Sequence, residues 1–128
     1  MKILLEKEES EKIFHDALCN GHSLAYAGLS IDYSNEDYHK AKKSLQKNPN
    51  SSICLEDVWM QILRLGGKLT LLDDEGGMEP KSIELKDVHE MVSKTELRHL
   101  IDAILEEGDA TTAEVILQTV FYGEVIFG

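Results

Sequence analysis

The clearest pattern of apolar and polar positions lies between residues 51 and 77. Apolar residues there first recur at intervals of three and four, which is the period of one face of an α-helix. Gly66 and Gly67 follow, and glycine readily adopts the left-handed conformation that ends a helix. Leu69 and Leu71 then lie two positions apart, the spacing of one face of a strand. The predicted apolar face of the helix consists of Leu55, Val58, Trp59, Ile62 and Leu63.

The preceding residues predict two helices with a strand between them. The first helix runs from about residue 6 or 9 to Cys19 and ends at Asn20 and Gly21. Ser34 is the predicted N-cap of the second helix. Between the helices, small and apolar residues alternate with polar ones, which predicts a half-buried strand. The alternating set consists of Ala25, Ala27, Leu29, Ile31 and Tyr33.

The remaining residues predict a hairpin and three helices. The glycine-rich and proline-containing turn DDEGGMEPKS leads into SIEL, a predicted returning strand. After a first short helix, Thr95 is the predicted cap of the second, and Asp109 or Thr111 begins the last. The tail EVIFG is predicted to be either a final strand or an apolar extension. The predicted apolar positions of the middle helix are Leu97, Leu100, Ile101, Ile104 and Leu105.

These elements predict a single compact α+β domain that spans residues 1–128. Five or six helices would pack on a small, mainly antiparallel sheet, because the expected strands are joined by short turns or lie near the helices in sequence. At 128 residues the chain is long enough to bury roughly two-thirds of its unfolded surface.

The charge of the chain is strongly negative. With 24 acids against 13 lysines and arginines, the net charge is −11, which argues against a broad face for direct nucleic-acid binding. It favours a protein partner with a basic surface. Spaced carboxylates could also imitate phosphates. The candidate interface residues are Glu6, Glu8, Glu9 and Glu11, then Asp73, Asp74, Glu75 and Glu79, then Glu106, Glu107 and Asp109, and finally the apolar Val125, Ile126 and Phe127.

Motifs for chemistry are scarce in this sequence. There is no HExxH, GxSxG, GxxxxGK or GxGxxG, so no cofactor, metal or catalytic residue is predicted. An EF-hand loop starting at Asp73 would place Met78 where the sharp turn needs glycine. His15 and Cys19, one helical turn apart, are the candidate base and nucleophile, although a thiol on an apolar helix face is more often inert.

The cellular setting is inferred from what the sequence contains. Cys19 and Cys54 form no CxxC pair, and two reduced, buried thiols are expected. The first residues are acidic rather than basic, and no apolar run reaches the roughly 18 residues that span a bilayer. We therefore expect no membrane partner and a location in the cytoplasm of a bacterial host.

Two segments resemble small uncharacterised proteins of bacteriophages and other mobile elements of bacteria. They are CLEDVWMQILRLGGKLTLLDDEGG and SIELKDVHEMVSKTELRHLIDAILEEGDATTAEVILQTVFYGEVIFG, so the resemblance covers the chain from Cys54 onward. The resemblance implies no reaction and transfers no functional residue. It implies a protein that binds and blocks a host or defence component, including CRISPR effectors.

Three functional hypotheses follow. The first is a non-enzymatic acidic binding protein of phage or mobile-element type, acting on a protein and in one version by nucleic-acid mimicry. The second is a binder of small molecules or nucleotides, or an enzyme, with a pocket near Trp59, His89 and His99. The third is an assembly protein that forms homo-oligomers through its C-terminal VIFG segment.

Overall fold

The computed structural model describes residues 3–48 and 52–127. Within these residues, six α-helices and a three-stranded antiparallel sheet form an α+β fold, which confirms the predicted fold class. Two 3₁₀ segments complete it. The elements in chain order are α1 (Lys7–Asn20), η1 (Gly21–Ala27), β1 (Leu29–Asp32), α2 (Asn35–Leu45), α3 (Leu55–Arg64), β2 (Leu69–Asp73), β3 (Lys81–Ile83), α4 (Leu85–Met91), η2 (Val92–Lys94), α5 (Leu97–Ile104) and α6 (Ala110–Tyr122).

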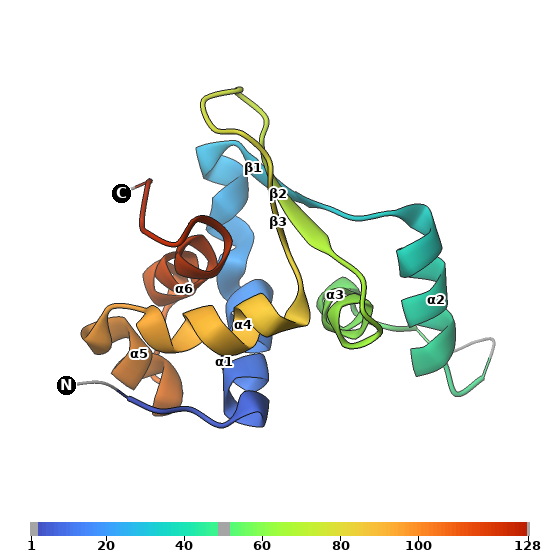
Figure 1. The fold of residues 1–128 in the computed structure, drawn as a ribbon, viewed down its shortest axis with the longest axis horizontal. Coiled ribbons are helices and arrows are strands. Elements are labelled where there is room, and N and C mark those ends of the chain that lie inside the picture. The colour runs from blue at the N-terminus through green and yellow to red at the C-terminus, as the bar shows by residue number, and fades with distance from the viewer. Residues whose placement is uncertain (1–2, 49–51, 128) are drawn as a thin grey trace.

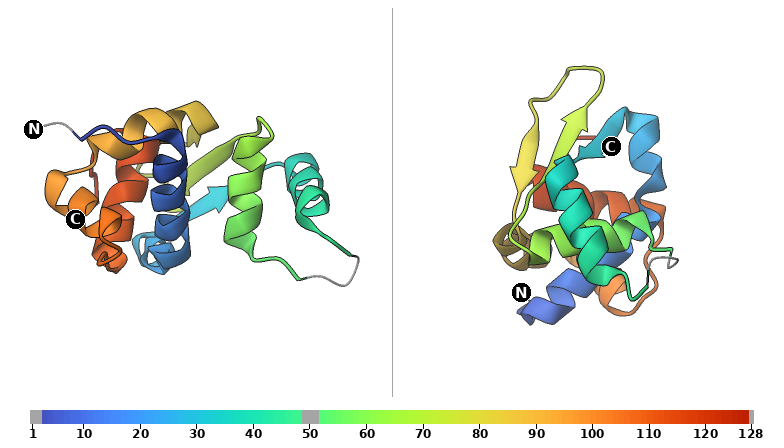
Figure 2. Two further views of the ribbon diagram at one scale, coloured as in Figure 1. Left: turned by 90° about the horizontal axis from the view of Figure 1, so that it is seen from below. Right: turned by 90° about the vertical axis from the view of Figure 1, so that its right-hand side faces the viewer.

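The helices form two groups about the sheet, which touch through α1 and α3. Figure 1 shows α1, α4, α5 and α6 on one side of the sheet and α2 and α3 on the other, and the left-hand view of Figure 2 shows the same division. Strand β2 is central, with β1 and β3 antiparallel on its two edges, so the predicted hairpin of β2 and β3 is confirmed. Leu69 pairs with Ile83 and Leu71 with Ile31, which places the three buried side chains Leu69, Leu71 and Ile83 on one face.

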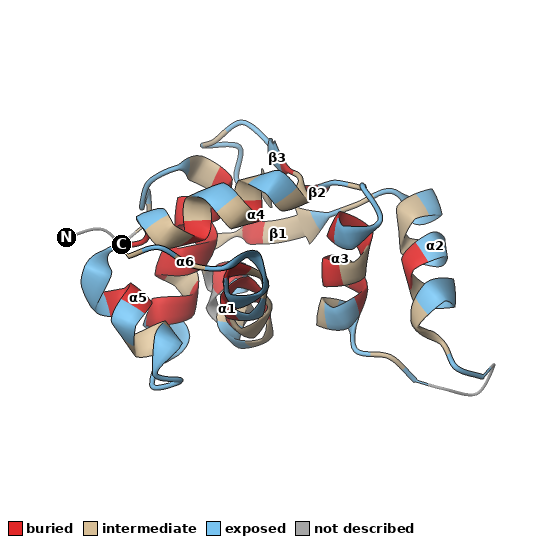
Figure 3. Cartoon of the chain, turned by 60° about the horizontal axis from the view of Figure 1, so that its bottom comes forward, coloured by how far each residue is buried: buried red, intermediate tan, exposed pale blue. Residues whose placement is uncertain are grey.

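Helix α6 forms the centre of the larger group. Its predicted inner face is confirmed, since Ala113, Ile116, Leu117, Val120 and Phe121 are all buried. Helix α1 packs along α6, and the rings of Phe14 and Phe121 lie 6.1 Å apart. Figure 3 shows the buried positions gathered on the facing sides of these two helices. This contact is the core against which the other elements pack.

The predicted strand around residues 25–33 is correct in its second half and wrong in its first. Only the part from Leu29 to Asp32 is a strand, and η1 precedes it. A 3₁₀ helix has about three residues per turn, so Gly21, Leu24 and Ala27 share one face of η1. Leu24 is buried there, and a Cβ on Gly21 would lie 2.7 Å from Leu117 of α6. This close packing on α6 is a tertiary effect that the alternating pattern did not reveal.

Helix α3 is confirmed, but its buried surface is wider than predicted. Met60 is fully buried in addition to the predicted Val58, Ile62 and Leu63, whereas Leu55 is 40 % exposed. The reason is that α3 lies between α2 on one side and α1 and β2 on the other. A helix covered on two sides buries residues outside a single apolar stripe.

Helix α2 is attached to the rest of the fold through α3 and an aromatic cluster. Its predicted N-cap is confirmed, because the Ser34 hydroxyl accepts a hydrogen bond of 3.1 Å from the Asp37 amide. The Tyr33 ring stacks on Tyr38 at 5.7 Å and lies 6.3 Å from the Trp59 ring. Ring contacts of this kind add to the burial energy of the side chains involved.

Two polar links join α3 to α1. Glu11 of α1 accepts a 2.9 Å hydrogen bond from Arg64 of α3, and its second oxygen lies 2.9 Å from His89 of α4. The Asp57 carboxylate of α3 lies 2.6 Å from His15 of α1. Burial by itself would raise the pKa of Glu11, but the hydrogen bonds from His89 and Arg64 outweigh it and lower that pKa below its usual value of 4.5.

Candidate protein-interaction surface

Helix α5 exposes most of its apolar face. Leu97, Ile101, Ile104 and Leu105 are between 39 and 59 % exposed, whereas the buried residues of the helix are His99 and Leu100. At 3.6 residues per turn, the four side chains fall within an arc of roughly 100°, with the buried Leu100 directly beside one edge of this arc and the buried His99 on the far side of the helix. Of the predicted apolar positions of this helix, only Leu100 is fully buried. We call Leu97, Ile101, Ile104 and Leu105 the α5 stripe.

The contacts of His99 and Leu100 explain this orientation. The Nδ1 atom of His99 lies 3.1 Å from the Thr112 hydroxyl of α6, and Leu100 is 1 % exposed. The predicted cap is also wrong, because Glu96 occupies the N-cap position. Thr95 is instead buried, and its hydroxyl has no hydrogen-bond partner among the described residues. α5 is thus fixed to α6 by a polar bond and one leucine, which leaves its stripe uncovered.

The two terminal segments lie at the same end of the molecule as α5 (Figures 1 and 2). They expose Leu4 near the start and Val125 and Ile126 near the end. The tail is an apolar extension and not a strand, so that one of the two predicted alternatives holds. Among the residues that the structure describes, most of the large hydrophobic side chains that are exposed therefore lie at this end. The exceptions are Leu55 and Leu65, in the α3 region.

A buried glutamine holds the tail in place. The Gln118 side chain of α6 accepts hydrogen bonds of 2.8 Å from the Ile126 and Phe127 amides and donates one of 3.0 Å to the Phe127 carbonyl. The Phe127 ring packs 6.2 Å from that of Tyr122. Phe127 thus packs onto the protein, while Val125 and Ile126 remain available for contacts.

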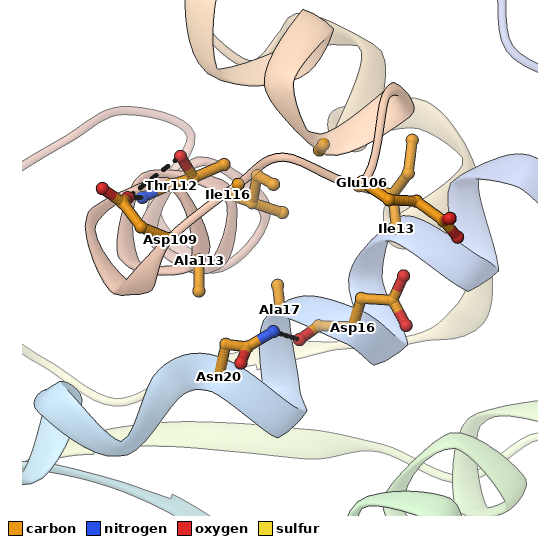
Figure 4. A pocket seen from close by; sticks show the side chains of 11 residues that line it. Ile13, Asp16, Ala17, Asn20, Glu106, Asp109, Thr112, Ala113 and Ile116 are labelled. Carbon is orange, nitrogen blue, oxygen red and sulfur yellow. Dashed lines mark hydrogen bonds between the residues drawn. The ribbon is translucent and has the colours of Figure 1, made fainter.

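A pocket of about 130 Å³ lies where the α5 stripe ends, between α1 and the turn from α5 to α6. Its floor is apolar, and Figure 4 shows Ala17 and Ala113 in the middle of it. The Asp16 and Glu106 carboxylates converge on one side, and Asp109 lies on the other (Figure 4). The pocket thus combines an apolar interior with a negatively charged rim.

Lys12 bridges two of the rim carboxylates. Its ammonium group donates a 3.1 Å hydrogen bond to Asp16 and another to Glu106. The Glu106 bond, followed by the Asp16 bond, raises the pKa of Lys12, and the same ammonium lowers the pKa of Glu106. Glu106 uses Oε1 for this contact, which leaves Oε2 as an acceptor. A cation therefore already lies at this rim.

The third group of candidate acids is Glu106, Glu107 and Asp109, and its members differ in what they do. Asp109, one of the two predicted starting residues, is the N-cap of α6 and accepts a 2.9 Å hydrogen bond from the Thr112 amide, which lowers the pKa of Asp109. Glu106 has a left-handed backbone with φ of 59° at the end of α5. Glu107 is exposed beside it. The cluster lies next to the α5 stripe.

The first group of candidate acids, Glu6, Glu8, Glu9 and Glu11, mainly stabilises the fold. Glu6 and Glu9 form a reciprocal capping box at the start of α1, with the Glu6 amide donating to Glu9 at 3.1 Å. Glu11 is the bridge to α3 and α4 described above. Glu8 is exposed and lines a groove of about 500 Å³ between α1 and α3.

The second cluster forms the tip of the β2–β3 hairpin. Asp73 accepts a 3.0 Å hydrogen bond from the Glu75 amide, and Asp74 accepts one of 3.1 Å from the Ser30 hydroxyl. The Glu75 side chain lies against Gly28, and Glu79 is exposed. These acids shape the turn, and the turn lies away from α5 (Figure 1).

The geometry around Cys19 does not match a catalytic triad. The Cys19 sulfur lies 3.9 Å from His15 Nε2, and the same nitrogen lies 2.6 Å from Asp57. In a triad, the base uses one ring nitrogen for the nucleophile and the other for the orienting acid. Burial, followed by the charges of Glu56 and Asp16, also raises the pKa of Cys19, which disfavours the thiolate.

Both cysteines are free thiols, but their burial differs from the expectation. Cys19 is partly buried and Cys54 is exposed at the N-cap of α3. The prediction of two buried thiols is therefore wrong for Cys54, because the first residue of α3 faces the groove between α1 and α3.

The structure does not bring Trp59, His89 and His99 together. Trp59 lines a cavity of about 340 Å³ beside η1 and β1, whereas His89 contacts Glu11 and His99 contacts Thr112. Helix α5 lies at one end of the molecule, whereas α3 lies on the other side of the sheet, next to α2 (Figure 1). The pocket expected from these three residues is therefore not assembled in this form.

Sequence reasoning missed Lys12, Asp16 and Gln118. The spacing of Lys12 and Asp16, four positions apart on one helix, is a signal for an ion pair that could have placed them. Gln118 stands within the apolar run VILQTVF, and a polar residue in such a run indicates a buried hydrogen-bonding role. The contact between Lys12 and Glu106, 94 positions apart, has no sequence signal.

Compared with known proteins, the chain matches no family model, no curated protein and no solved structure. In the part of the chain that the structure describes, no three His, Cys, Asp or Glu residues are grouped so as to hold a metal ion. No helix of that part is both long and apolar enough to cross a membrane.

Proposed function

We propose that this is a non-enzymatic binding protein that acts by occupying the surface of a basic protein partner through the α5 stripe. The observation that carries the proposal is the orientation of α5, which leaves Leu97, Ile101, Ile104 and Leu105 between 39 and 59 % exposed. Exposed apolar side chains in a continuous patch are costly in water, and such patches mark interaction sites.

The charge around the stripe supports a basic partner. Four acidic residues lie next to the stripe in sequence, whereas the helix itself contains one basic residue, Arg98. The acids are Glu96, Asp102, Glu106 and Glu107. The whole chain carries a net charge of −11. A second copy of the chain would bring the same acids together across a symmetric interface, whereas a basic partner would neutralise them.

The biological setting that we propose is that of a phage or mobile element, in which the protein blocks a host or defence protein such as a CRISPR effector. The resemblance of the chain from Cys54 onward to small phage proteins supports this setting. Mimicry of nucleic acid has less support, because Glu6, Glu9, Glu11 and Asp109 are engaged in helix caps and bridges.

The test compares three immobilised proteins in capture from a bacterial lysate. They are the wild type, the double variant Ile101→Ser/Ile104→Ser, and the control Leu65→Ser, which removes an exposed leucine after α3. We expect the wild type and the control to retain a common host protein and the double variant to lose about tenfold or more of it, as is typical of interface hot spots. If all three proteins retain the same set in the same amounts, the stripe is not the binding surface.

A further inference from the structure

We infer that Cys19 of α1 and Cys54 at the start of α3 form a reversible disulfide that ties the two groups of helices together under oxidising conditions. Both cysteines are free thiols in this structure, and the chain has no other cysteine. The disulfide goes beyond the proposed function, because it concerns the contact between α1 and α3 and not the α5 stripe.

Two contacts fix how α1 and α3 lie against each other. Glu11 of α1 accepts a 2.9 Å hydrogen bond from Arg64 of α3. One turn further along α1, His15 lies 2.6 Å from Asp57, which precedes Arg64 by about two turns of α3. The two helices therefore run in opposite directions, as the left-hand view of Figure 2 also shows.

The same register places the two cysteines opposite each other. Cys19 lies one further turn along α1 from His15, and its sulfur lies 3.9 Å from His15 Nε2. Cys54 lies about one turn before Asp57 and lines the groove between α1 and α3 together with His15 and Asp57. Burial and then the nearby carboxylates raise the pKa of Cys19, and Cys54 is a further cause, so the two thiols are within electrostatic reach.

The packing of the helices and the position of Cys54 allow the bond to close. Helices α1 and α3 are in contact, and axes about 8–10 Å apart bring facing Cα atoms to within roughly 6 Å of each other. A disulfide spans Cα atoms about 4.4–6.8 Å apart. Cys54 has an extended backbone ahead of the first turn of α3, and its side chain makes no capping hydrogen bond. Its thiol is therefore free to turn toward Cys19.

The reaction is a thiol–disulfide exchange, with oxidised glutathione as the oxidant. The exposed Cys54 reacts first, because its thiolate attacks one sulfur of oxidised glutathione and releases one glutathione thiolate. Cys19 then loses its proton to water, attacks the Cys54 sulfur of the mixed disulfide and releases the second glutathione. The protein gives up two electrons and two protons, which convert the glutathione disulfide into two thiols.

The bond would restrain the smaller group of helices. It would close a loop from residue 19 to residue 54 that contains η1, β1 and α2. Closing a loop removes conformations mainly from opened and unfolded states. The two groups of helices touch through α1 and α3, so the bond would hold α3 on α1 and, through α3, would also hold α2. Reversible disulfides of this kind are the redox-sensing ones in reducing compartments.

The test follows the products that form in oxidised glutathione. Intact mass and peptide mapping distinguish them, because an internal disulfide loses two hydrogen atoms whereas a mixed disulfide gains one glutathione. We expect the wild type to end with the internal bond between Cys19 and Cys54. Cys19→Ser should stop at the mixed disulfide on Cys54, and Cys54→Ser should stay mainly reduced, because Cys19 is partly buried.

The matched control is Cys54→Ser/Lys43→Cys, which moves the exposed thiol to the surface of α2. It should form an internal bond at least about tenfold more slowly than the wild type, since position 54 gives Cys19 a higher effective concentration of its partner. Circular dichroism and the urea midpoint of the reduced proteins verify that each variant is folded.

Hydrogen exchange then measures the effect of the bond on the fold. The α2 amides of the wild type should exchange at least about threefold more slowly after oxidation and return to their former rates in dithiothreitol. The same treatment should leave Cys19→Ser unchanged in this respect.

Three results would overturn the inference. If the wild type stops at the mixed disulfide or forms only disulfide-linked dimers, the two thiols do not come within reach of each other. If its internal bond forms no faster than that of the control, position 54 gives no advantage. If the bond forms but α2 exchanges as before, it does not tie the helices together. None of these results bears on the α5 stripe, which is tested separately by capture from a lysate.

Discussion

At the scale of single residues, Glu11 connects three helices with one carboxylate. Each of its oxygens binds a different side chain, Arg64 of α3 and His89 of α4. The Glu11 side chain is 16 % exposed, so solvent screens these contacts less than it screens a surface ion pair. Removing one member of such a group leaves the others without their partner.

We predict that Glu11→Gln lowers the free energy of unfolding by about 1–3 kcal/mol at neutral pH. The pKa of Glu11 is lowered in the folded protein from its usual 4.5. Its charged form therefore stabilises the fold at pH values above 4.5, and this contribution is lost as the pH falls through the lower folded pKa. Urea unfolding of both proteins between pH 7 and pH 3 should show the difference shrinking toward acid.

The control for this prediction is Glu8→Gln, an exposed acid of the same helix. It should change the stability by no more than about 0.5 kcal/mol. A stability difference between the wild type and Glu11→Gln that stays constant down to pH 3 would show that the charge of Glu11 has no part in joining the helices.

At the scale of elements, we predict that two neighbouring residues of α5 contribute very differently to the free energy of unfolding. Leu100→Ala should lower the free energy of unfolding by about 2–5 kcal/mol, because Leu100 is fully buried. Ile101→Ser should lower it by about 1 kcal/mol or less, because Ile101 is 41 % exposed. Equilibrium urea unfolding measures both. Equal losses would mean that α5 is turned differently about its axis.

Helix α5 also shows what the sequence pattern does not determine, namely which of its apolar residues are buried. The existence of α5 follows from its periodicity, but periodicity gives the apolar face and not what that face meets. In α6 the whole predicted face is buried, and Thr112, Val115, Gln118 and Thr119 are buried besides, because α1, η1, α5, α4 and β3 surround the helix. In α5 the contact of His99 with Thr112 and the burial of Leu100 set the rotation.

Tertiary packing also overrode the alternating pattern at residues 25–27. Alternation from Ala25 onward predicted a strand there, whereas these residues belong to the 3₁₀ segment η1, which approaches α6 closely where Gly21 meets Leu117. The candidate site could likewise be predicted only in part. Its tail residues and the acids 106, 107 and 109 were predicted from composition, but the pocket is formed by residues from α1, α5 and α6 that only the fold brings together.

At the scale of the whole molecule, the two groups of helices should differ in local stability. Helix α6 buries residues along most of its length, whereas α2 contributes Ala41 to the core and packs mainly on α3. Elements with few buried contacts open at lower free energy than the global transition. We predict that α2 opens without unfolding α6.

Native-state hydrogen exchange measures this difference. After correction for intrinsic rates, the amides of α2 should exchange at least about tenfold faster than those in the middle of α6. The first amides of each helix serve as the internal reference, since they lack intrahelical partners. Equal protection of α2 and α6 would mean that the molecule opens only as one unit.

The exposed thiol of Cys54 has a practical consequence for reagents. Because Cys19 is partly buried and its pKa is raised, a maleimide at neutral pH should modify Cys54 first. Cys54 begins α3, on the side of the sheet opposite α5 (Figure 1). A dye or surface tether attached there would lie in the groove between α1 and α3, which Lys12 also lines, and away from the α5 stripe. Single-site chemistry can therefore present the protein in one orientation without a fusion tag beside the surface under study.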